Sequence, residues 1–393
     1  KKFLLIFFTL LIFFAVFFII LFLLLGKTTD TVVIVQKNEN KVKVDVEEID
    51  KEKNNQKNSY KIFYKTQPKV IFDTDTTEVI TFETYIPVRY SIEYGTSQVY
   101  GKILENKEYK RSYEIKLTSL LPNTKYFYKL IIYDDYKGRN DDIQSFFYTK
   151  TEESRDYRFA VLGDSRPVSG DTQPEVFRKI VNQIKVLSPD FVIMLGDIVQ
   201  LSDVDYVDYK EADIMWKGFT DVVSPVSVSI PWYLAVGNHD ETDQKESLKR
   251  YQEIWAFPKE RTNSQWHSET IYTFTYSDSQ FIILNTEEPD NSNTISKSQF
   301  DWIEKKLKSN EKDRTFIFSH KPIQGSKRKI ESTYGDRLHT LFLKNNVSAV
   351  FSAHDHLYCT FKTDNLDYII SGGAGSPLYK DLCNGREISD YHF

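Results

Sequence analysis

The stretch FVIMLGDIVQ at residues 191–200 is an apolar run that ends in a carboxylate, Asp197. The same arrangement, an apolar run closed by polar side chains, returns at residues 158–164, 232–240, 314–320 and 347–356. Amphipathic segments such as 174–187 and 296–308 separate these runs. Buried strands that alternate with amphipathic helices are typical of a layered α/β domain. We therefore predict such a domain over residues 153–393.

Each of these apolar runs leads into a possible metal ligand. In chain order the candidate ligands are Asp164, Asp197, Asn238, His320, His354 and His356. In open α/β sheets, ligands gather at the carboxyl ends of the strands, where the loops converge. Carboxylate, amide oxygen and imidazole together suit Mn, Fe, Zn or Co better than an all-oxygen calcium site. The sequence therefore predicts a transition-metal centre at the strand ends.

The region before this domain has a different pattern. Between residues 60 and 152, short runs with a period of two are rich in Tyr, Phe, Ile and Thr and are separated by Pro, Asp, Gly and Asn. This pattern predicts an all-β sandwich. Residues 27–59 are rich in Lys, Glu, Asp and Asn, which predicts a solvated polar stalk. The last residues, DYHF at 390–393, have the pattern of a strand that is beginning, so we expect a truncated C-terminus.

The N-terminal segment predicts a membrane anchor over residues 1–26. Residues 3–25 carry no charge, and a helix of this length reaches about 34 Å, enough to cross a hydrocarbon layer of about 30 Å. A long cleaved signal is the alternative. Lysines lie on both sides of the segment, so the positive-inside comparison is close to even. We expect a membrane-anchored protein with its folded part on the extracytoplasmic side.

Composition excludes several classes of protein. Hydrophobic residues make up 40% of the 393, which excludes a wholly disordered chain. The net charge of -5 gives no electrostatic reason to expect nucleic acid as a partner. Two cysteines, Cys359 and Cys383, are too few for a disulfide scaffold. They either pair in an oxidising compartment or remain free thiols.

The ordered motifs resemble those of a known family. GDSR, GDIVQ, GNHD, SH and AHDH, in this order, are similar to the motifs of the calcineurin-like metallophosphoesterases. The residues around Leu120, Pro122 and Tyr126 resemble the fibronectin type III signature at its tyrosine corner, where a Tyr hydroxyl bonds back to a nearby turn. A sandwich before the catalytic domain makes the purple acid phosphatase-like subgroup the nearest likeness.

The resemblance implies a centre of two divalent or trivalent transition-metal ions, such as Fe, Mn or Zn, that hydrolyses a phosphoester substrate. It implies that Asp197 bridges both ions. Asn238, His320 and His354 would complete the shell of the second ion, and Asp164 with His356 would bind the first. His239 would face the substrate as the general acid that protonates the leaving group, or else play an orienting role.

Two residues depart from the family pattern. Many members have His where this chain has Arg166, and the purple enzymes have Tyr where it has Gln200. Either Gln200 lends an amide oxygen to the first metal, or that metal keeps extra waters and binds more weakly. Arg166 could pair with the substrate phosphate as a catalytic residue, or form a structural ion pair. These departures leave one alternative function that is not enzymatic: a membrane-anchored surface binding or adhesion module with a non-catalytic metal site.

Overall fold

The structure is a computed structural model that describes residues 34–38, 41–45, 64–135, 138–168, 170, 172–201, 209–240, 251, 254–255, 270–287, 295–326, 328–330 and 333–379. The chain divides into two compact units, Lys1–Tyr60 and Lys61–Phe393. In the first unit, β1 (Ile34–Asn38) and β2 (Lys41–Asp45) pair antiparallel inside the predicted stalk. The predicted anchor lies outside the described residues. Among the helices within the described ranges, none is both long and apolar enough to cross a membrane.

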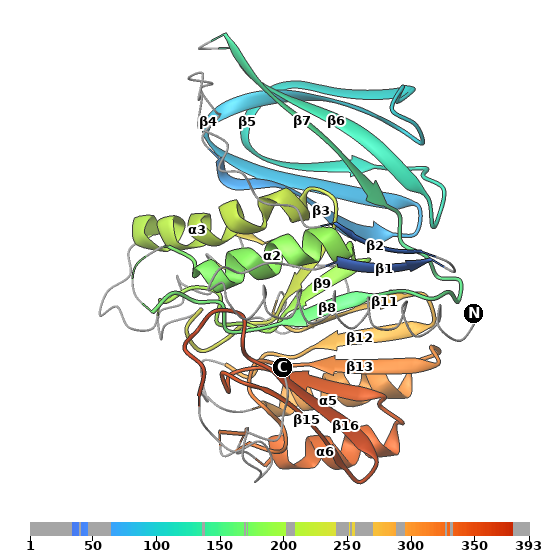
Figure 1. Cartoon of the computed structure of the whole chain (residues 1–393), viewed down its shortest axis with the longest axis vertical. Coiled ribbons are helices and arrows are strands. Elements are labelled where there is room, and N and C mark those ends of the chain that lie inside the picture. The colour runs from blue at the N-terminus through green and yellow to red at the C-terminus, as the bar shows by residue number, and fades with distance from the viewer. Residues whose placement is uncertain are drawn as a thin grey trace, which may run out of the picture. The chain divides into compact units, whose positions relative to one another are not determined.

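The second unit begins with an antiparallel β domain, drawn in blue to green in Figure 1. Its strands are β3 (Tyr64–Thr74), β4 (Thr77–Gly95), β5 (Lys102–Leu117), β6 (Lys125–Asp134) and β7 (Arg139–Tyr148). They pair in the order β3-β4-β6-β7. Strand β5 lies off this path and pairs with β4 on both sides of Pro87. The antiparallel β region predicted from the sequence is therefore present.

Strand β4 corrects one detail of the sequence interpretation. The runs on either side of Pro87 read as separate strands, because Pro cannot donate to a ladder. The structure instead joins them into one strand of 19 residues. Its pairing with β5 shifts register between Glu83 and Val88, and Pro is tolerated at such an irregularity. The predicted tyrosine corner is confirmed, because the Tyr126 hydroxyl accepts a bond of 2.9 Å from the backbone N–H of Leu121.

The α/β domain contains two sheets. Parallel strands β8 (Phe159–Leu162), β9 (Phe191–Met194) and β10 (Trp232–Leu234) form the smaller sheet in the order β10-β9-β8. The larger sheet has the order β11-β12-β13-β14-β16-β15, from β11 (Tyr272–Tyr276), β12 (Ser279–Ile283), β13 (Arg314–Phe318), β14 (Ala349–Ser352), β15 (Tyr358–Thr363) and β16 (Leu366–Ser371). Aromatic rings fill the space between the sheets, as where Phe191 and Phe281 lie with ring centroids 5.0 Å apart.

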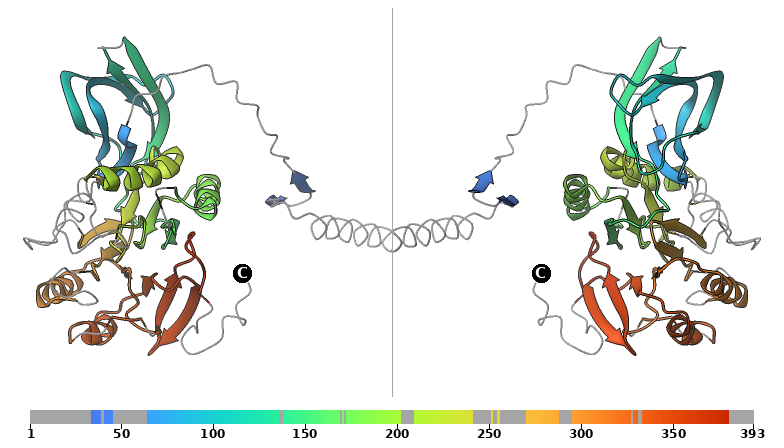
Figure 2. Two further views of the ribbon diagram at one scale, coloured as in Figure 1. Left: turned by 90° about the vertical axis from the view of Figure 1, so that its left-hand side faces the viewer. Right: turned by 90° about the vertical axis from the view of Figure 1, so that its right-hand side faces the viewer.

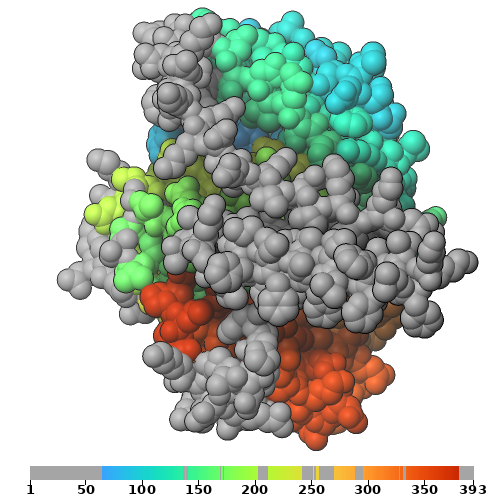
Figure 3. Space-filling view, viewed as in Figure 1, coloured from blue at the N-terminus to red at the C-terminus, as the bar shows by residue number. Residues whose placement is uncertain are grey.

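Helices cover the outer faces of both sheets, so the predicted layered α/β architecture is present (Figure 2). Helices α2 (Glu175–Leu187) and α3 (Tyr209–Ser227) share one apolar core with β8, β9 and β10. Helices α5 (Lys297–Lys308) and α6 (Gly335–Lys344) pack in a second core with β12, β13 and β14. The segment after β16 returns to the start of α2, where Gly375 lies against Pro174, and its red surface adjoins the green of α2 in Figure 3.

The β domain and the α/β domain share a buried contact, which we call the domain seam and define by Phe72, Glu78, Tyr128 and Tyr233. Phe72 of β3 packs in the α/β core, with its ring centroid 5.5 Å from that of Tyr276. The Tyr128 hydroxyl donates to the carbonyl of Val228 at 2.6 Å. Within the described part of the chain, the carboxyl oxygens of fully buried Glu78 have no hydrogen-bond partner. Burial raises the pKa of Glu78 well above its ordinary range.

Candidate metal centre

All of the predicted site residues meet at one edge of the α/β domain. Asp164 follows β8, Asp197 follows β9, and His320 and His354 follow β13 and β14. The strands of each group run parallel, so their carboxyl ends and the loops after them converge. The same edge carries every other candidate of the sequence analysis: Arg166, Gln200, Asn238, His239 and His356.

The first group of possible ligands is Asp164, Asp197 and His356. One ligand atom from each lies within 4.8 Å of the others, and all three residues are buried. Asp164 Oδ1 stands 3.4 Å from His356 Nε2 and has no hydrogen-bond partner within the described ranges. His356 Nδ1 lies 2.9 Å from the carbonyl of Pro377, so it donates there and leaves the lone pair of Nε2 free. An orphaned carboxylate oxygen beside such a nitrogen fits a metal ion.

The second group is Asn238, His320 and His354, with Asp197 beside it. His320 Nδ1 lies 2.8 Å from the carbonyl of Leu195, which again leaves Nε2 as the ligand atom. That Nε2 is 3.1 Å from Asn238 Oδ1, 3.2 Å from His354 Nδ1 and 3.3 Å from Asp197 Oδ1. Three possible ligand atoms, each from a different loop, thus lie within 3.3 Å of His320 Nε2. Asp197 is the residue common to both groups. The family resemblance implies the same division of the ligands between two metal ions.

The backbone around these ligands is tightly constrained. Asp164, Asp197 and His354 have φ angles of 62°, 52° and 65°, a left-handed conformation that costs free energy for residues other than glycine. A Cβ at Gly237 would lie 2.3 Å from Asp197 Oδ1, and one at Gly372 would lie 2.8 Å from Asp164 Oδ2. Glycine is needed at both positions because the backbone passes directly over a ligand.

Burial acts differently on the two carboxylates. It raises the pKa of Asp164, and the neighbouring His356 offsets this only in part. Burial would raise the pKa of Asp197 as well, but the neighbouring His320, His239 and Arg166 outweigh it and hold that pKa below its usual value. Asp197 is therefore the better-supported anion of the pair, in keeping with a bridging position between two cations.

The pKa values of the two imidazoles of the second group are shifted in opposite directions. Burial alone would lower the pKa of His320, but the carboxylates of Asp197 and Asp164 raise it. Burial, reinforced by the charge on His320, lowers the pKa of His354 to about 2. Metal ligation requires neutral imidazole, so a cation at this group would compete with protonation of His320.

The two residues that depart from the family pattern contact each other. Arg166 Nη1 donates to Gln200 Oε1, and Arg166 Nε lies 3.3 Å from Asp197 Oδ2. Gln200 Nε2 lies 3.0 Å from His239 Nδ1. The amide oxygen that the sequence analysis offered to the first metal is therefore already engaged by Arg166. The ion pair that was the alternative for Arg166 is present.

The sequence analysis missed one residue at this edge, Asp240. It is fully buried, and its carboxylate accepts bonds from the backbone N–H groups of Ile198, Val199 and Gly237 at 2.6, 3.0 and 2.8 Å. It thereby ties the loop after β9 to the loop after β10. Burial, with the nearby Asp197, raises the pKa of Asp240 to about 7. The signal was in the sequence, because Asp240 is the last residue of GNHD.

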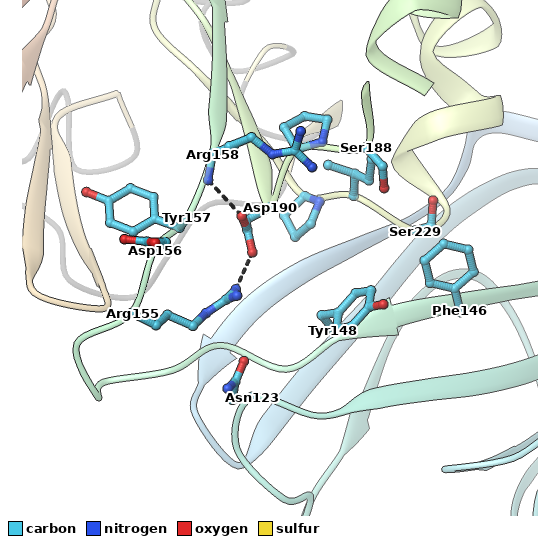
Figure 4. A pocket seen from close by; sticks show the side chains of 13 residues that line it. Asn123, Phe146, Tyr148, Arg155, Asp156, Tyr157, Arg158, Ser188, Asp190 and Ser229 are labelled. Carbon is cyan, nitrogen blue, oxygen red and sulfur yellow. Dashed lines mark hydrogen bonds and ion pairs between the residues drawn. The ribbon is translucent and has the colours of Figure 1, made fainter. Parts of the chain in front are cut away.

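Other candidates lie elsewhere or outside the described residues. A cavity of about 490 Å³, lined among others by Asn123, Tyr148, Arg158 and Asp190, opens before strands β8, β9 and β10, at the opposite edge from the metal centre (Figure 4). Cys359 is buried and disulfide-bonded, which excludes the free-thiol alternative for it. Cys383 lies beyond the described residues.

Comparison with known proteins places the metal centre in a family context. Residues 157–358 match the sequence model of the family described as calcineurin-like phosphoesterase. Purple acid phosphatase 21 of Arabidopsis thaliana is 26% identical over 315 residues, which is 76% of this chain and 64% of that protein. Human tartrate-resistant acid phosphatase type 5 is 24% identical over 239 residues, which is 55% of this chain and 72% of that protein. The chain thus spans just under two thirds of the length of the plant relative.

Solved structures share the fold. The structure of purple acid phosphatase PPD1 from yellow lupin (Lupinus luteus) seeds superposes with a TM-score of 0.61 at 17% identity, covering 79% of this chain and 65% of that one. The structure of PhoD gives the same TM-score at 13% identity, covering 81% and 78%. Both matches extend over most of the chain, so the likeness includes more than the α/β domain.

Proposed function

The chain belongs to the calcineurin-like phosphoesterase family, within which it is similar to the purple acid phosphatases, and on that premise we propose that it hydrolyses a phosphoester at the metal centre described above. The observation that carries the proposal is the convergence of six donor residues on two adjoining groups that share Asp197. Whether the substrate is a monoester or a diester depends on features outside the metal centre.

We assign the metal ligands by group. Asp164 and His356 would hold one ion, Asn238, His320 and His354 the other, and Asp197 both. When bound, the two ions supply positive charge to the phosphoryl oxygens and acidify a water molecule. The chain keeps the donor atoms in place beforehand, since Pro377 and Leu195 orient the two imidazoles through their carbonyls. The extra ligands usual at the first ion are missing, so we expect that ion to bind more weakly.

Two side chains would act on the substrate. Arg166, with 14% of its side chain exposed, lies beside Asp197 and would attract the phosphate charge to the centre. His239, with 18% exposed, stands at the rim with Nε2 3.8 Å from Asp197 Oδ2. From there it would donate a proton to the leaving oxygen.

The decisive experiment is an ester assay on the full chain purified in detergent. A chromogenic phosphomonoester and a phosphodiester are each tested with and without added Mn, and metal content is measured on the same samples. We expect turnover of at least one ester, dependent on metal. Full metal content with no turnover of either ester would favour the binding module instead.

His239→Ala separates chemistry from metal binding. Loss of the proton donor should lower turnover by about 10²- to 10⁴-fold. Metal content should not change, because the imidazole is outside both ligand groups. Elemental analysis of the purified variant checks the second statement, and a loss of metal in step with turnover would show that His239 is a ligand.

We also propose that residues 3–25 anchor the protein in a membrane with the folded part on the extracytoplasmic side. The support is the uncharged apolar run of the sequence. Protease treatment of intact cells should remove the folded part. Its protection until the cells are lysed would contradict this orientation.

A further inference from the structure

We propose that Gln200 is a positioning residue that, held by Arg166, fixes His239 in the tautomer with its hydrogen on Nε2. Its bearing on catalysis rests on the proposed function: proton donation to the leaving oxygen requires the imidazolium, and the tautomer describes the neutral ring before that proton is taken up. The tautomer itself is a property of the folded chain and is measured without substrate.

The first step concerns the amide of Gln200. A guanidinium has donors and no acceptor. Arg166 Nη1 contacts one end of the Gln200 amide, so that end must be the oxygen. The NH₂ group is then directed to the other side, toward His239. The orientation of the amide is thus determined by the hydrogen-bond network, as it must be for an Asn or Gln side chain.

The second step concerns the imidazole. Gln200 Nε2 lies 3.0 Å from His239 Nδ1, and an NH₂ group can only donate. Nδ1 must therefore accept, and in a neutral ring the hydrogen then resides on Nε2. His239 Nε2 is the nitrogen that approaches the metal centre, 3.8 Å from Asp197 Oδ2.

The neighbouring histidines show that this arrangement is specific to His239. In His320 and His356, Nδ1 faces a backbone carbonyl, which accepts its hydrogen and leaves a lone pair on Nε2 for a metal. In His239 the partner of Nδ1 is a donor, so Nδ1 carries the lone pair and Nε2 carries the hydrogen. Nε2 becomes a hydrogen-bond donor and is unsuited to ligation. One edge of the fold therefore holds imidazoles of both kinds, and the identity of the Nδ1 partner decides between them.

Gln200 is buried, and backbone hydrogen bonds hold the loops around it. Gln200 is only 4% exposed. The backbone N–H of His239 donates to Asp197 Oδ1 at 3.0 Å, and its carbonyl accepts from the N–H of Leu201 at 2.8 Å. These bonds fix the loops that carry Gln200 and His239 relative to each other. Arg166, Gln200, His239 and Asp197 are thus linked by successive polar contacts.

The experiment is nitrogen NMR of the full chain labelled with ¹⁵N-histidine, in metal-free and zinc-loaded protein at one fixed pH. His239→Asn identifies the signal. We expect His239 of the wild type to be almost entirely the Nε2–H tautomer. Gln200→Glu provides two acceptor oxygens, one for Arg166 and one for His239, and should move the hydrogen to Nδ1. Gln200→Leu removes the donor and should leave a mixture of the two tautomers.

A matched control and the contrary results complete the test. Gln144→Glu makes the same change of charge on the exposed face of β7 and should leave the His239 signal as in the wild type. An Nδ1–H tautomer in the wild type would overturn the proposal, as would an unchanged signal in Gln200→Leu. If Gln200→Glu does not fold, the His239 signals of the wild type and of Gln200→Leu still test the proposal. A protein that hydrolyses no ester but keeps the Nε2–H tautomer would contradict the proposed function alone.

Discussion

Buried acids occur both in the metal centre and at the domain seam, and they are treated in opposite ways. Asp197 is 1% exposed and surrounded by positive groups, and its pKa is lowered. Glu78 is 0% exposed and has no hydrogen-bond partner in the described structure, and its pKa is raised. The side chains of Asp197 and Glu78 are thus equally buried, but the groups around them differ. The direction of the pKa shift of a buried acid is therefore decided by the groups around it, as the comparison of Asp197 with Glu78 shows.

The largest effect is expected at the acid with the most partners. Asp197→Asn replaces one shared carboxylate oxygen by an NH₂ group, which cannot ligate. We expect metal loss from both groups and a fall in turnover of at least ~100-fold, since groups that only orient a ligand are already worth about 10- to 100-fold. Elemental analysis with the ester assay measures both.

Asp221→Asn is the matched control, because 42% of that side chain is exposed on α3. It should retain metal and turnover. A wild-type metal content in Asp197→Asn would show that the carboxylate does not bridge two ions. Asp197 would then no longer be a functional counterpart to Glu78 of the domain seam.

Asp240 tests whether a satisfied buried carboxylate also stabilises the fold. Asp240→Ala leaves three buried backbone N–H groups without their acceptor, and each such loss costs about 1–3 kcal/mol. We expect a fall of about 3 kcal/mol in the free energy of unfolding, measured by urea denaturation. Asp221→Ala should stay within about 0.5 kcal/mol of the wild type. Equal stability of Asp240→Ala and the wild type would mean that water replaces the carboxylate.

Much of the fold, and the meeting of the candidate ligands at one edge, was predictable, because both depend on local patterns. An apolar run followed by Asp, Asn or His marks a strand end whether or not its neighbours are known, and the parallel pairing brings such ends together. The joined strand β4 was not predictable, since Pro87 breaks a ladder in most contexts and is accommodated here by a shift of register.

The hydrogen-bond network of the site was beyond the sequence for a different reason. Gln200 and Arg166 were recognised as departures, but their contact depends on the directions of two side chains on separate loops. Asp240 ends the GNHD motif, but its role depends on the backbone N–H groups of Ile198 and Val199 in another loop, and the motif does not show those contacts. Glu78 likewise reads as an ordinary polar position of a strand, and only the packing of the two domains buries it.

At the domain seam, substitution of the buried acid should have an effect of opposite sign. Below the usual pKa of Glu78, 4.5, the carboxyl is protonated in both the folded and the unfolded chain. As pH rises above 4.5, the unfolded chain releases this proton while the folded chain retains it. Stability therefore falls with rising pH until the raised pKa is reached, by at most about 1.4 kcal/mol for each pH unit. Glu78→Gln resembles the protonated form and cannot lose a proton.

We therefore expect Glu78→Gln to match the wild type near pH 4 and to be more stable than it at pH 7, as measured by urea unfolding at several pH values. Glu114→Gln, at an exposed position of β5, should follow the wild-type pH dependence. A Glu78→Gln variant that is less stable than the wild type at pH 7 would mean that the carboxylate is ionised and paired in the folded protein. Glu78 would then be a stabilised anion like Asp197, and the contrast between the two regions would disappear.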